Sequence, residues 1–201
     1  MQLLETERLL LRPFTKDDVE SYYEVYWQIA AGHNGQQRQA DEHPNVDDIR
    51  DENAYYLGFA NYSFLQPFGR WMMVLKTERQ NIGACLLIPQ LFTPDEVALC
   101  AAPESHKPRF GAFEISMGWA LARSYRGDGY AAEAARRLIA YGFDTVKLQR
   151  VMSWADPDNI ASISVMRKVG MQIVSPPEAK RVISIIENDH PLTTQSGYSL
   201  R

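Results

Sequence analysis

Residues 123–131 read Arg-Ser-Tyr-Arg-Gly-Asp-Gly-Tyr-Ala, and they join two segments of opposite character. The preceding run, residues 110–122, is apolar apart from the charge of Glu114 and is typical of a strand. In the following run, residues 131–146, apolar positions recur every three or four residues, which is typical of an amphipathic helix. The sequence therefore predicts a strand, a glycine-containing turn and a helix in direct succession.

The turn has the composition of an anion site. No Ser, Thr or Asn immediately precedes the helix, and Asp128 is the one side chain placed to cap its first amides. The amides left for a ligand are those of Gly127, Gly129, Tyr130 and Ala131. Such amides bind phosphate at a helix N-terminus, glycine allows close approach, and Arg126 adds a charged fork. Because Gly-x-Gly is also common in plain tight turns, the motif alone leaves both interpretations open.

Upstream of this unit, the pattern predicts an opening strand, a helix-loop-helix and a β-hairpin. These elements are expected at residues 8–12, 15–32, 46–65, 70–76 and 82–88. Thr15 is the expected N-cap of the first helix, with Asp18 returning the hydrogen bond as in a capping box. The segment 89–108 contains four prolines and is predicted to be irregular.

Downstream, the pattern predicts a strand, a helix that ends at a left-handed Gly170, and further strands. They are expected at 150–155, 160–169, 171–174 and 181–186, with 198–201 as a further candidate. This order is neither strictly alternating nor all-β. It favours a mixed α/β (α+β) sheet with an antiparallel front half.

Length, charge and cysteine content exclude several classes of protein. The chain of 201 residues fits a single domain spanning 1–201, with a net charge of −4. The absence of a basic stripe, of about 18 consecutive apolar residues and of a secretory signal argues against nucleic-acid binding, a membrane span and secretion. Cys85 and Cys100 lie in apolar surroundings and the histidines show no metal-ligand spacing, so we expect a cytoplasmic protein without a metal site.

A dinucleotide-binding fold is one alternative, because Gly127-x-Gly129-x-x-Ala132 matches a loose form of the Rossmann fingerprint. That loop normally follows its strand at once and opens the domain, whereas here more than half of the chain precedes it. The next strand, residues 150–155, also lacks the acidic residue that binds ribose. Both observations count against this interpretation.

Four segments carry a resemblance to a different family. They are Thr6-Glu7-Arg8-Leu9-Leu10-Leu11-Arg12-Pro13, the hairpin over 71–87 with Ile82-Gly83, Arg126-x-x-Gly129-x-Ala131, and Asp158-Asn159-x-x-Ser162 followed by Lys168-Val169-Gly170-Met171. In this order and at this spacing, they resemble the GNAT superfamily of acetyl-CoA-dependent N-acetyltransferases, most closely its RimJ/RimL-like branch. The resemblance covers nearly the whole chain.

The resemblance implies a mostly antiparallel central sheet, flanked by helices, that splays where acetyl-CoA binds. The two diverging strands would be residues 110–122 and 150–155. In this family the pantetheine arm binds the backbone of the first of them, in the manner of an added strand. The backbone positions that match are Trp119, Ala120 and Leu121.

The resemblance also places the rest of the cofactor. The pyrophosphate would bind the amides of Gly127, Gly129, Tyr130 and Ala131, with Arg126 beside it. Asn159 and Ser162 would face the cofactor from the last helix. Asp128 departs from the basic or neutral residue of many relatives, and we expect it to point outward because a carboxylate repels phosphate.

Direct transfer of the acetyl group from the thioester to a primary amine is the implied reaction. Glu114 is the candidate general base, because apolar surroundings raise the pKa of a carboxylate; a glutamate that faces water or pairs with an arginine is the alternative. Many relatives place a tyrosine acid where this chain has Met166. Ser162 is then the candidate proton donor to the thiolate, or a serine that contacts only the cofactor or its own helix.

The acceptor amine is left open by the sequence. The branch includes enzymes for protein N-termini and for small amines, and loops such as 32–45 and 89–108 usually determine this choice. Acidic residues near the first loop, among them Glu42 and Asp47, favour a cationic acceptor or form a solvated face. The alternative to an enzyme is a regulatory module that binds CoA or acyl-CoA with little transfer. The oligomeric state is expected to be either a monomer or a homodimer.

Overall fold

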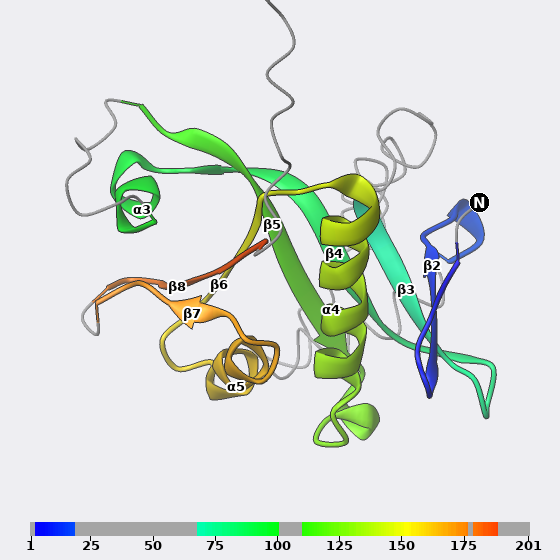
Figure 1. Cartoon of the computed structure of the whole chain (residues 1–201). Helices are drawn as coiled ribbons and strands as arrows, with labels where there is room; N and C mark the ends of the chain where they lie inside the picture. Colours follow the sequence, from blue (N-terminus) through cyan, green and yellow to red (C-terminus); the bar gives the residue numbers. More distant parts are fainter. Residues whose placement is uncertain (1–2, 19–67, 101–109, 177–178, 189–201) are drawn as a thin grey trace, which may run out of the picture.

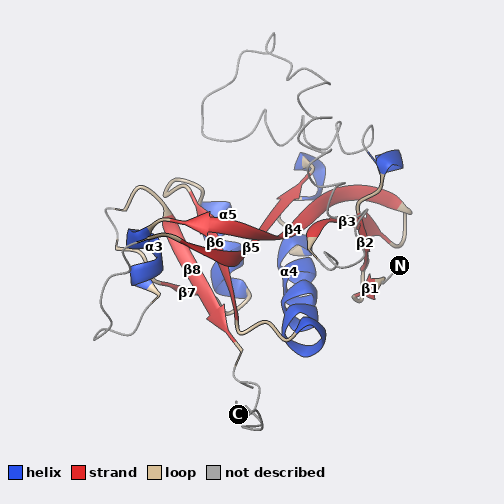
Figure 2. Ribbon diagram, turned by 90° about the horizontal axis from the view of Figure 1, so that it is seen from above, coloured by secondary structure: helices blue, strands red, loops and turns tan. Residues whose placement is uncertain are grey.

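The computed structural model describes residues 3–18, 68–100, 110–176 and 179–188, which Figures 1 and 2 show from two directions. These residues form an eight-stranded sheet in the order β1-β2-β3-β4-β5-β6-β8-β7. Every neighbouring pair of strands is antiparallel except β5 and β6, which are parallel. The prediction of a mixed sheet with an antiparallel front half is therefore confirmed.

The strands are β1 (Leu4–Glu5), β2 (Leu9–Pro13), β3 (Gly69–Leu75), β4 (Gln80–Phe92), β5 (Ala112–Leu121), β6 (Arg150–Ala155), β7 (Gln172–Ile173) and β8 (Val182–Glu187). The α-helices are α3 (Pro94–Leu99), α4 (Tyr130–Tyr141) and α5 (Ile160–Lys168). Short 3-10 turns lie at η1 (Lys16–Asp18) and η3 (Arg123–Tyr125), and a π-helical turn, η4 (Gly142–Val146), follows α4. The predicted elements over 19–65, the segment 101–108 and the predicted strand at 198–201 lie outside the described residues.

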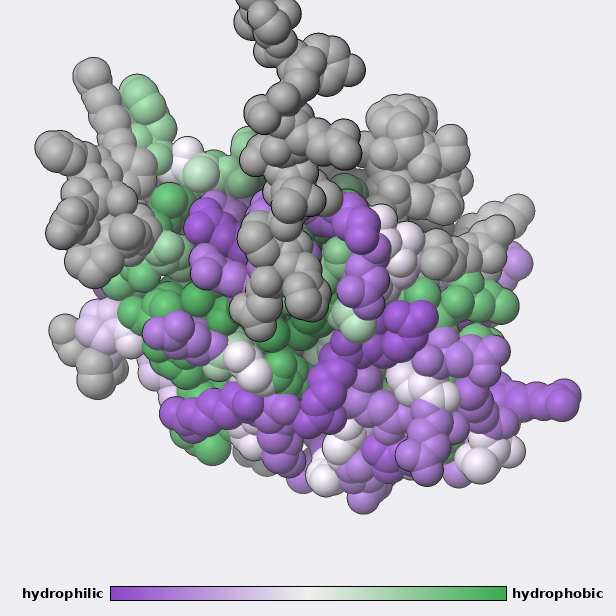
Figure 3. All heavy atoms as spheres, in the orientation of Figure 1, coloured by the Kyte–Doolittle hydropathy of each residue, from purple (hydrophilic) through white to green (hydrophobic). Residues whose placement is uncertain are grey.

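The described helices divide between the two faces of the sheet. Side chains alternate along β6, so that Val151 packs in the core with α4 and α5 while Met152 packs with residues of α3 on the other face. Figure 1 shows α4 lying along β4 and β5, with α5 beside it. The surface over the lower part of α4 is hydrophilic (Figure 3), as expected for a helix that buries one side.

The segment after residue 88 is more regular than its prolines suggest, and the prediction of an irregular segment is wrong for residues 89–99. β4 continues through Pro89 to Phe92. Since β3 begins at Gly69, opposite Leu87, β5 is the only strand of the described residues that pairs with β4 from there on. An edge strand tolerates a residue without an N–H. Thr93 then caps α3: it accepts from the Glu96 amide, while its own amide donates to the Glu96 carboxylate at 2.9 Å.

Two local predictions at chain turns are confirmed. The Thr15 amide donates to Asp18 Oδ2 at 2.8 Å, which is the returned hydrogen bond expected there. Asp18 also binds the Arg12 guanidinium through both carboxylate oxygens. Gly170 follows α5 with a φ of 87°, the left-handed conformation predicted for it.

Candidate functional site

The two edges of β5 are paired very differently. On one edge, β4 pairs with β5 over its whole length, from Phe92 opposite Ala112 to Gly83 opposite Leu121. On the other edge, within the described part of the chain, β5 and β6 share the single register pair Ser116 with Met152. Beyond Ser116 the two strands diverge, so the backbone of residues 117–121 faces an opening, and the predicted splay is confirmed.

The chain after β5 makes the turn that the sequence indicates. Gly127 has a φ of 98° and Gly129 a φ of 85°, which are backbone conformations that residues with a Cβ rarely adopt. Gly129 is the N-cap residue of α4, and no side chain caps the helix there. Asp128 is exposed and lies outside the pocket described below, in line with the outward orientation expected for it. The prediction of an uncapped helix start is confirmed.

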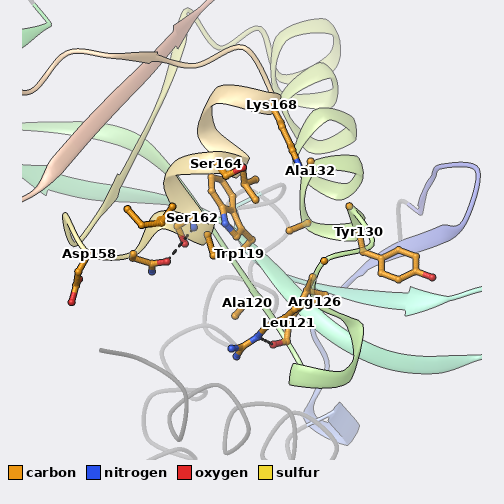
Figure 4. Close-up of a pocket in the computed structure, with 17 residues that line it drawn as sticks. Trp119, Ala120, Leu121, Arg126, Tyr130, Ala132, Asp158, Ser162, Ser164 and Lys168 are labelled. Atoms are coloured by element: carbon orange, nitrogen blue, oxygen red, sulfur yellow. Dashed lines mark hydrogen bonds between the residues drawn. The ribbon is translucent and has the colours of Figure 1, made fainter. Parts of the chain in front are cut away.

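A pocket of about 520 Å³ joins the open edge of β5 to this turn (Figure 4). Its walls come from the end of β5, from residues 126–132 and from one side of α5. Every residue predicted to bind the cofactor lines it: Trp119, Ala120, Leu121, Arg126, Gly127, Gly129, Tyr130, Ala131, Asn159 and Ser162. The structure thus brings together residues that lie up to 43 positions apart in the sequence.

Sequence reasoning missed seven of the residues that line the pocket, most of them on or next to α5. The additional lining residues are Ala132, Asp158, Ile160, Ala161, Ser164, Val165 and Lys168. Four of them, Ala161, Ser164, Val165 and Lys168, follow one another at the spacing of a single helix face. That spacing, counted from Ala161, could have found the other three.

The electrostatics of the pocket favour an anion at the turn. The Arg126 Nε donates to the Leu121 carbonyl at 3.1 Å, which holds this cation at the pocket. Partial burial and the neighbouring Arg123 cation lower the pKa of Arg126 below its ordinary value. Since both effects disfavour the charged form, the opposite charge of an anion bound here would offset them. Lys168 adds a second cation from the end of α5.

Asn159 and Ser162 are linked to each other as well as to the pocket. The Asn159 side chain caps α5 by accepting a hydrogen bond from the Ser162 amide at 3.1 Å, drawn as a dashed line in Figure 4. The Tyr130 ring, by contrast, points away from the pocket in Figure 4, and the Arg8 guanidinium lies 4.3 Å from its centroid. Tyr130 therefore offers its backbone, not its phenol, to a ligand.

Glu114 does not lie in the pocket lining. Its carboxylate is mostly buried and binds Arg150 of β6 through both oxygens, one of them 2.9 Å from Arg150 Nε. The structure thus shows the arginine-paired alternative, not an isolated carboxylate in apolar surroundings. Five positions separate Glu114 from Trp119, so their side chains lie on opposite faces of β5.

Other candidates are placed as follows. Met166, at the position where many relatives have tyrosine, is fully buried in the core and cannot donate a proton. Among the described residues, no cluster of His, Cys, Asp or Glu could hold a metal ion. No helix in the described part of the chain has the length and apolar character needed to cross a membrane.

The sequence matches known proteins over most of its length. A family model described as an acetyltransferase (GNAT) domain matches residues 8–172. The uncharacterized N-acetyltransferase YnaD of Bacillus subtilis is 40% identical over 63 residues, covering 31% of this chain and 37% of YnaD. This chain thus spans little more than a third of that relative in the match. A second one, YjdG of the same organism, is 25% identical over 178 residues, covering 85% of this chain and 89% of YjdG.

Solved structures share the fold. The GNAT-family acetyltransferase of Bacillus anthracis has a TM-score of 0.65 at 21% identity, covering 94% of this chain and 100% of that one. RimL, a ribosomal L7/L12 alpha-N-protein acetyltransferase solved with coenzyme A, has a TM-score of 0.66 at 12% identity, covering 94% of this chain and 99% of that one. At these identities the likeness establishes the fold alone. Because the family model matches most of the sequence and the folds agree, the chain belongs to the GNAT acetyltransferase domain family.

Proposed function

We propose that this protein transfers the acetyl group of acetyl-CoA to a primary amine, by direct attack within a ternary complex. One observation carries the proposal: the open edge of β5 and the uncapped start of α4 line a single pocket. A strand edge binds an extended amide-containing arm, and a helix N-terminus binds phosphate. Acetyl-CoA combines both chemistries in one molecule.

Each wall of the pocket then has a defined task. The backbone of Trp119, Ala120 and Leu121 would hold the pantetheine arm at the open edge of β5. The amides of the turn, from Gly127 to Ala131, would bind the pyrophosphate, with Arg126 supplying charge. Asn159 and Ser162 would border the arm from α5.

In the reaction, the amine nitrogen bonds to the thioester carbonyl carbon as the carbon–sulfur bond breaks, the amine loses a proton and the thiolate gains one. Glu114 is our proposed base. It lies on the face of β5 opposite Trp119, so an amine would approach from that face, where the carboxylate is paired with Arg150. Ser162 in the pocket lining is the proposed donor to the thiolate.

A second function is favoured by two observations. Met166 offers no acid, and Glu114 is engaged in an ion pair with Arg150 and lies outside the pocket lining. Both would suit a regulatory module that binds CoA or acyl-CoA with little transfer. For either function we propose a cytoplasmic monomer or homodimer. For the enzyme, the proposed acceptor is a protein N-terminus or a small amine.

Thermal unfolding with acetyl-CoA, CoA or NADH in large excess tests the cofactor. A ligand at about 100 times its Kd adds roughly 2.7 kcal/mol, which raises Tm by about 6 °C for a chain of this size. We expect both CoA species, and not NADH, to raise Tm. Arg126→Gln should reduce the shift, whereas Arg123→Gln, which removes the same charge outside the pocket lining, should preserve it.

Turnover separates the two functions. Release of free thiol from acetyl-CoA, measured with a panel of peptide and small amines, would establish the enzyme. A Tm shift without thiol release from any amine would favour the regulatory module. If neither CoA species raises Tm, the acetyltransferase proposal is wrong, and a shift with NADH would revive the dinucleotide interpretation.

A further inference from the structure

The opening segment Thr6-Glu7-Arg8 has so far no part in the proposed function, yet its side chains reach the phosphate turn more than 100 positions away. Arg8 Nε donates to Glu133 Oε2 at 2.7 Å, and Arg8 Nη2 lies 2.6 Å from the same oxygen. The other Glu133 oxygen, Oε1, accepts from the Thr6 hydroxyl at 2.5 Å and from the Arg8 amide at 3.0 Å. Glu133 lies in the first turn of α4, so this network fixes the start of α4 to the beginning of β2.

Arg8 also contacts the turn itself. Its Nη1 donates to the Asp128 carbonyl oxygen at 3.0 Å. Its guanidinium lies over the Tyr130 ring, 4.3 Å from the centroid. A Cβ added to Gly129 would lie 3.7 Å from Arg8 Nη2, which shows how closely the arginine is placed behind the turn.

The hydrogen bond to Asp128 has a consequence for the next amide. In a trans peptide unit, the carbonyl and the following N–H point in opposite directions. With the Asp128 carbonyl directed at Arg8, the Gly129 N–H is directed away from Arg8. Gly129 borders the pocket, so its amide is held in the orientation in which a pyrophosphate oxygen would accept from it.

We propose that Arg8, oriented by Glu133 and Thr6, is a positioning residue for pyrophosphate binding. It lies outside the pocket lining and acts through the peptide unit between Asp128 and Gly129. Two left-handed glycines give this turn little intrinsic preference for one conformation, which is why it needs an external brace. The inference rests on the proposed use of acetyl-CoA.

The test compares two ligands that differ in the pyrophosphate. Calorimetry on the full chain measures the Kd of CoA and of pantetheine, which lacks the nucleotide and its phosphates. Arg8→Met should raise the Kd of CoA by about tenfold and leave that of pantetheine within about twofold. Arg8→Lys keeps the charge but lacks the separate nitrogens through which Arg8 binds Glu133 and Asp128. It should behave in the same direction and serves if Arg8→Met does not fold.

The matched control is Lys76→Met. Lys76 binds Glu5 at 2.9 Å and the Thr6 carbonyl at 2.7 Å, so it braces the same corner of the sheet without contacting the turn. It should leave both Kd values within about twofold. Equal losses of CoA and pantetheine affinity in the Arg8 variants, or no loss in either, would overturn the positioning role. A wild-type chain that binds no CoA would instead overturn the proposed function.

Discussion

The two edges of β5 differ in how far they pair with the neighbouring strands, β4 and β6. Toward β4, pairing is continuous from Ala112 to Leu121. Toward β6, the described pairing is confined to Ser116 and Met152. The closed edge fixes the strand in the sheet, and the open edge leaves backbone groups for a ligand. A binding site can thus arise from the absence of pairing on a strand that is rigidly held on its other side.

Gly83 is the position on the closed edge where we expect an added side chain to destabilise the protein most. A Cβ at this position would lie 2.2 Å from the Ala120 carbonyl oxygen, a backbone atom that cannot move without displacing β5. Gly83→Ala should therefore lower the free energy of unfolding by about 3 kcal/mol, the largest effect we predict. Urea unfolding measures the change.

Gly118 provides the comparison on β5 itself. Among the described residues, a Cβ there would meet only the Leu86 side chain, at 3.6 Å, which is an ordinary contact. Gly118→Ala should change stability by less than about 1 kcal/mol. Similar losses in both variants would show that close approach to Ala120 is not what makes Gly83 special.

The Glu114–Arg150 ion pair links β5 to β6 at the closed end of the splay. The Glu114 side chain is 12% exposed and that of Arg150 30%, so removing one partner leaves a mostly buried charge. Glu114→Gln and Arg150→Gln should each lower stability by about 2 kcal/mol, with a coupling of about 1 kcal/mol in the double variant. Additive losses would contradict a direct link between the strands.

The Glu114→Gln variant also tests the proposed catalytic role of Glu114. If Glu114 is the base, Glu114→Gln should lower kcat while leaving the Kd of CoA unchanged, because the residue lies outside the pocket lining. Arg150→Gln retains the carboxylate and serves as the control for the lost pairing. Equal turnover in wild type and Glu114→Gln would remove Glu114 from the mechanism.

Glu133, at the start of α4 beside the open edge, should make the stability of the protein depend on pH. Burial raises the pKa of Glu133, but hydrogen bonds from Thr6 and Arg8 outweigh this and hold it below the ordinary value of 4.5. A lowered pKa contributes stability above the unfolded-state value that is lost as the pH falls through the folded-state value. Glu133→Gln should therefore cost about 1 kcal/mol near neutral pH, and the difference from wild type should shrink below about pH 4.5. A difference that stays constant with pH would contradict this origin.

The two cysteines allow a test of how firmly the closed edge is held. Cys85 lies on β4 opposite Trp119, and complete burial raises its pKa to about 12. Cys100, at the end of α3, is partly exposed. Thiol alkylation near neutral pH should modify Cys100 in the folded protein and Cys85 only at the rate of unfolding. Rapid labelling of both would show that the closed edge opens readily.

Much of the fold could be read from local patterns. The strand at 150–155 is found at the predicted residues, and the start of α4 follows from the glycines and the missing cap. The regular course of residues 89–99 was not predicted, because the tolerance of β4 for Pro89 depends on which residue lies opposite the start of β3, which is a tertiary fact. The Thr93-Pro-Asp-Glu96 capping box was readable in the sequence, and its signal was overlooked.

The site divides in the same way. The pocket residues on the turn could be predicted, because the glycines and the missing helix cap are visible in the sequence itself. The partner of Glu114 does not, because Arg150 lies 36 positions away and reaches it only through the parallel pairing of β5 with β6. The contact of Arg8 with the turn likewise depends on how α4 packs on β2.

An unpaired strand edge is ordinarily where proteins aggregate, since it accepts a strand of another molecule. Residues 117–121 carry such an edge, but it lies inside the sheet, with β6 on its flank and α5 along the pocket. A strand of another molecule would have to enter between β5 and β6, beside α5, to pair with this edge. The position of this edge inside the sheet therefore protects it from the edge-to-edge pairing by which sheets polymerise.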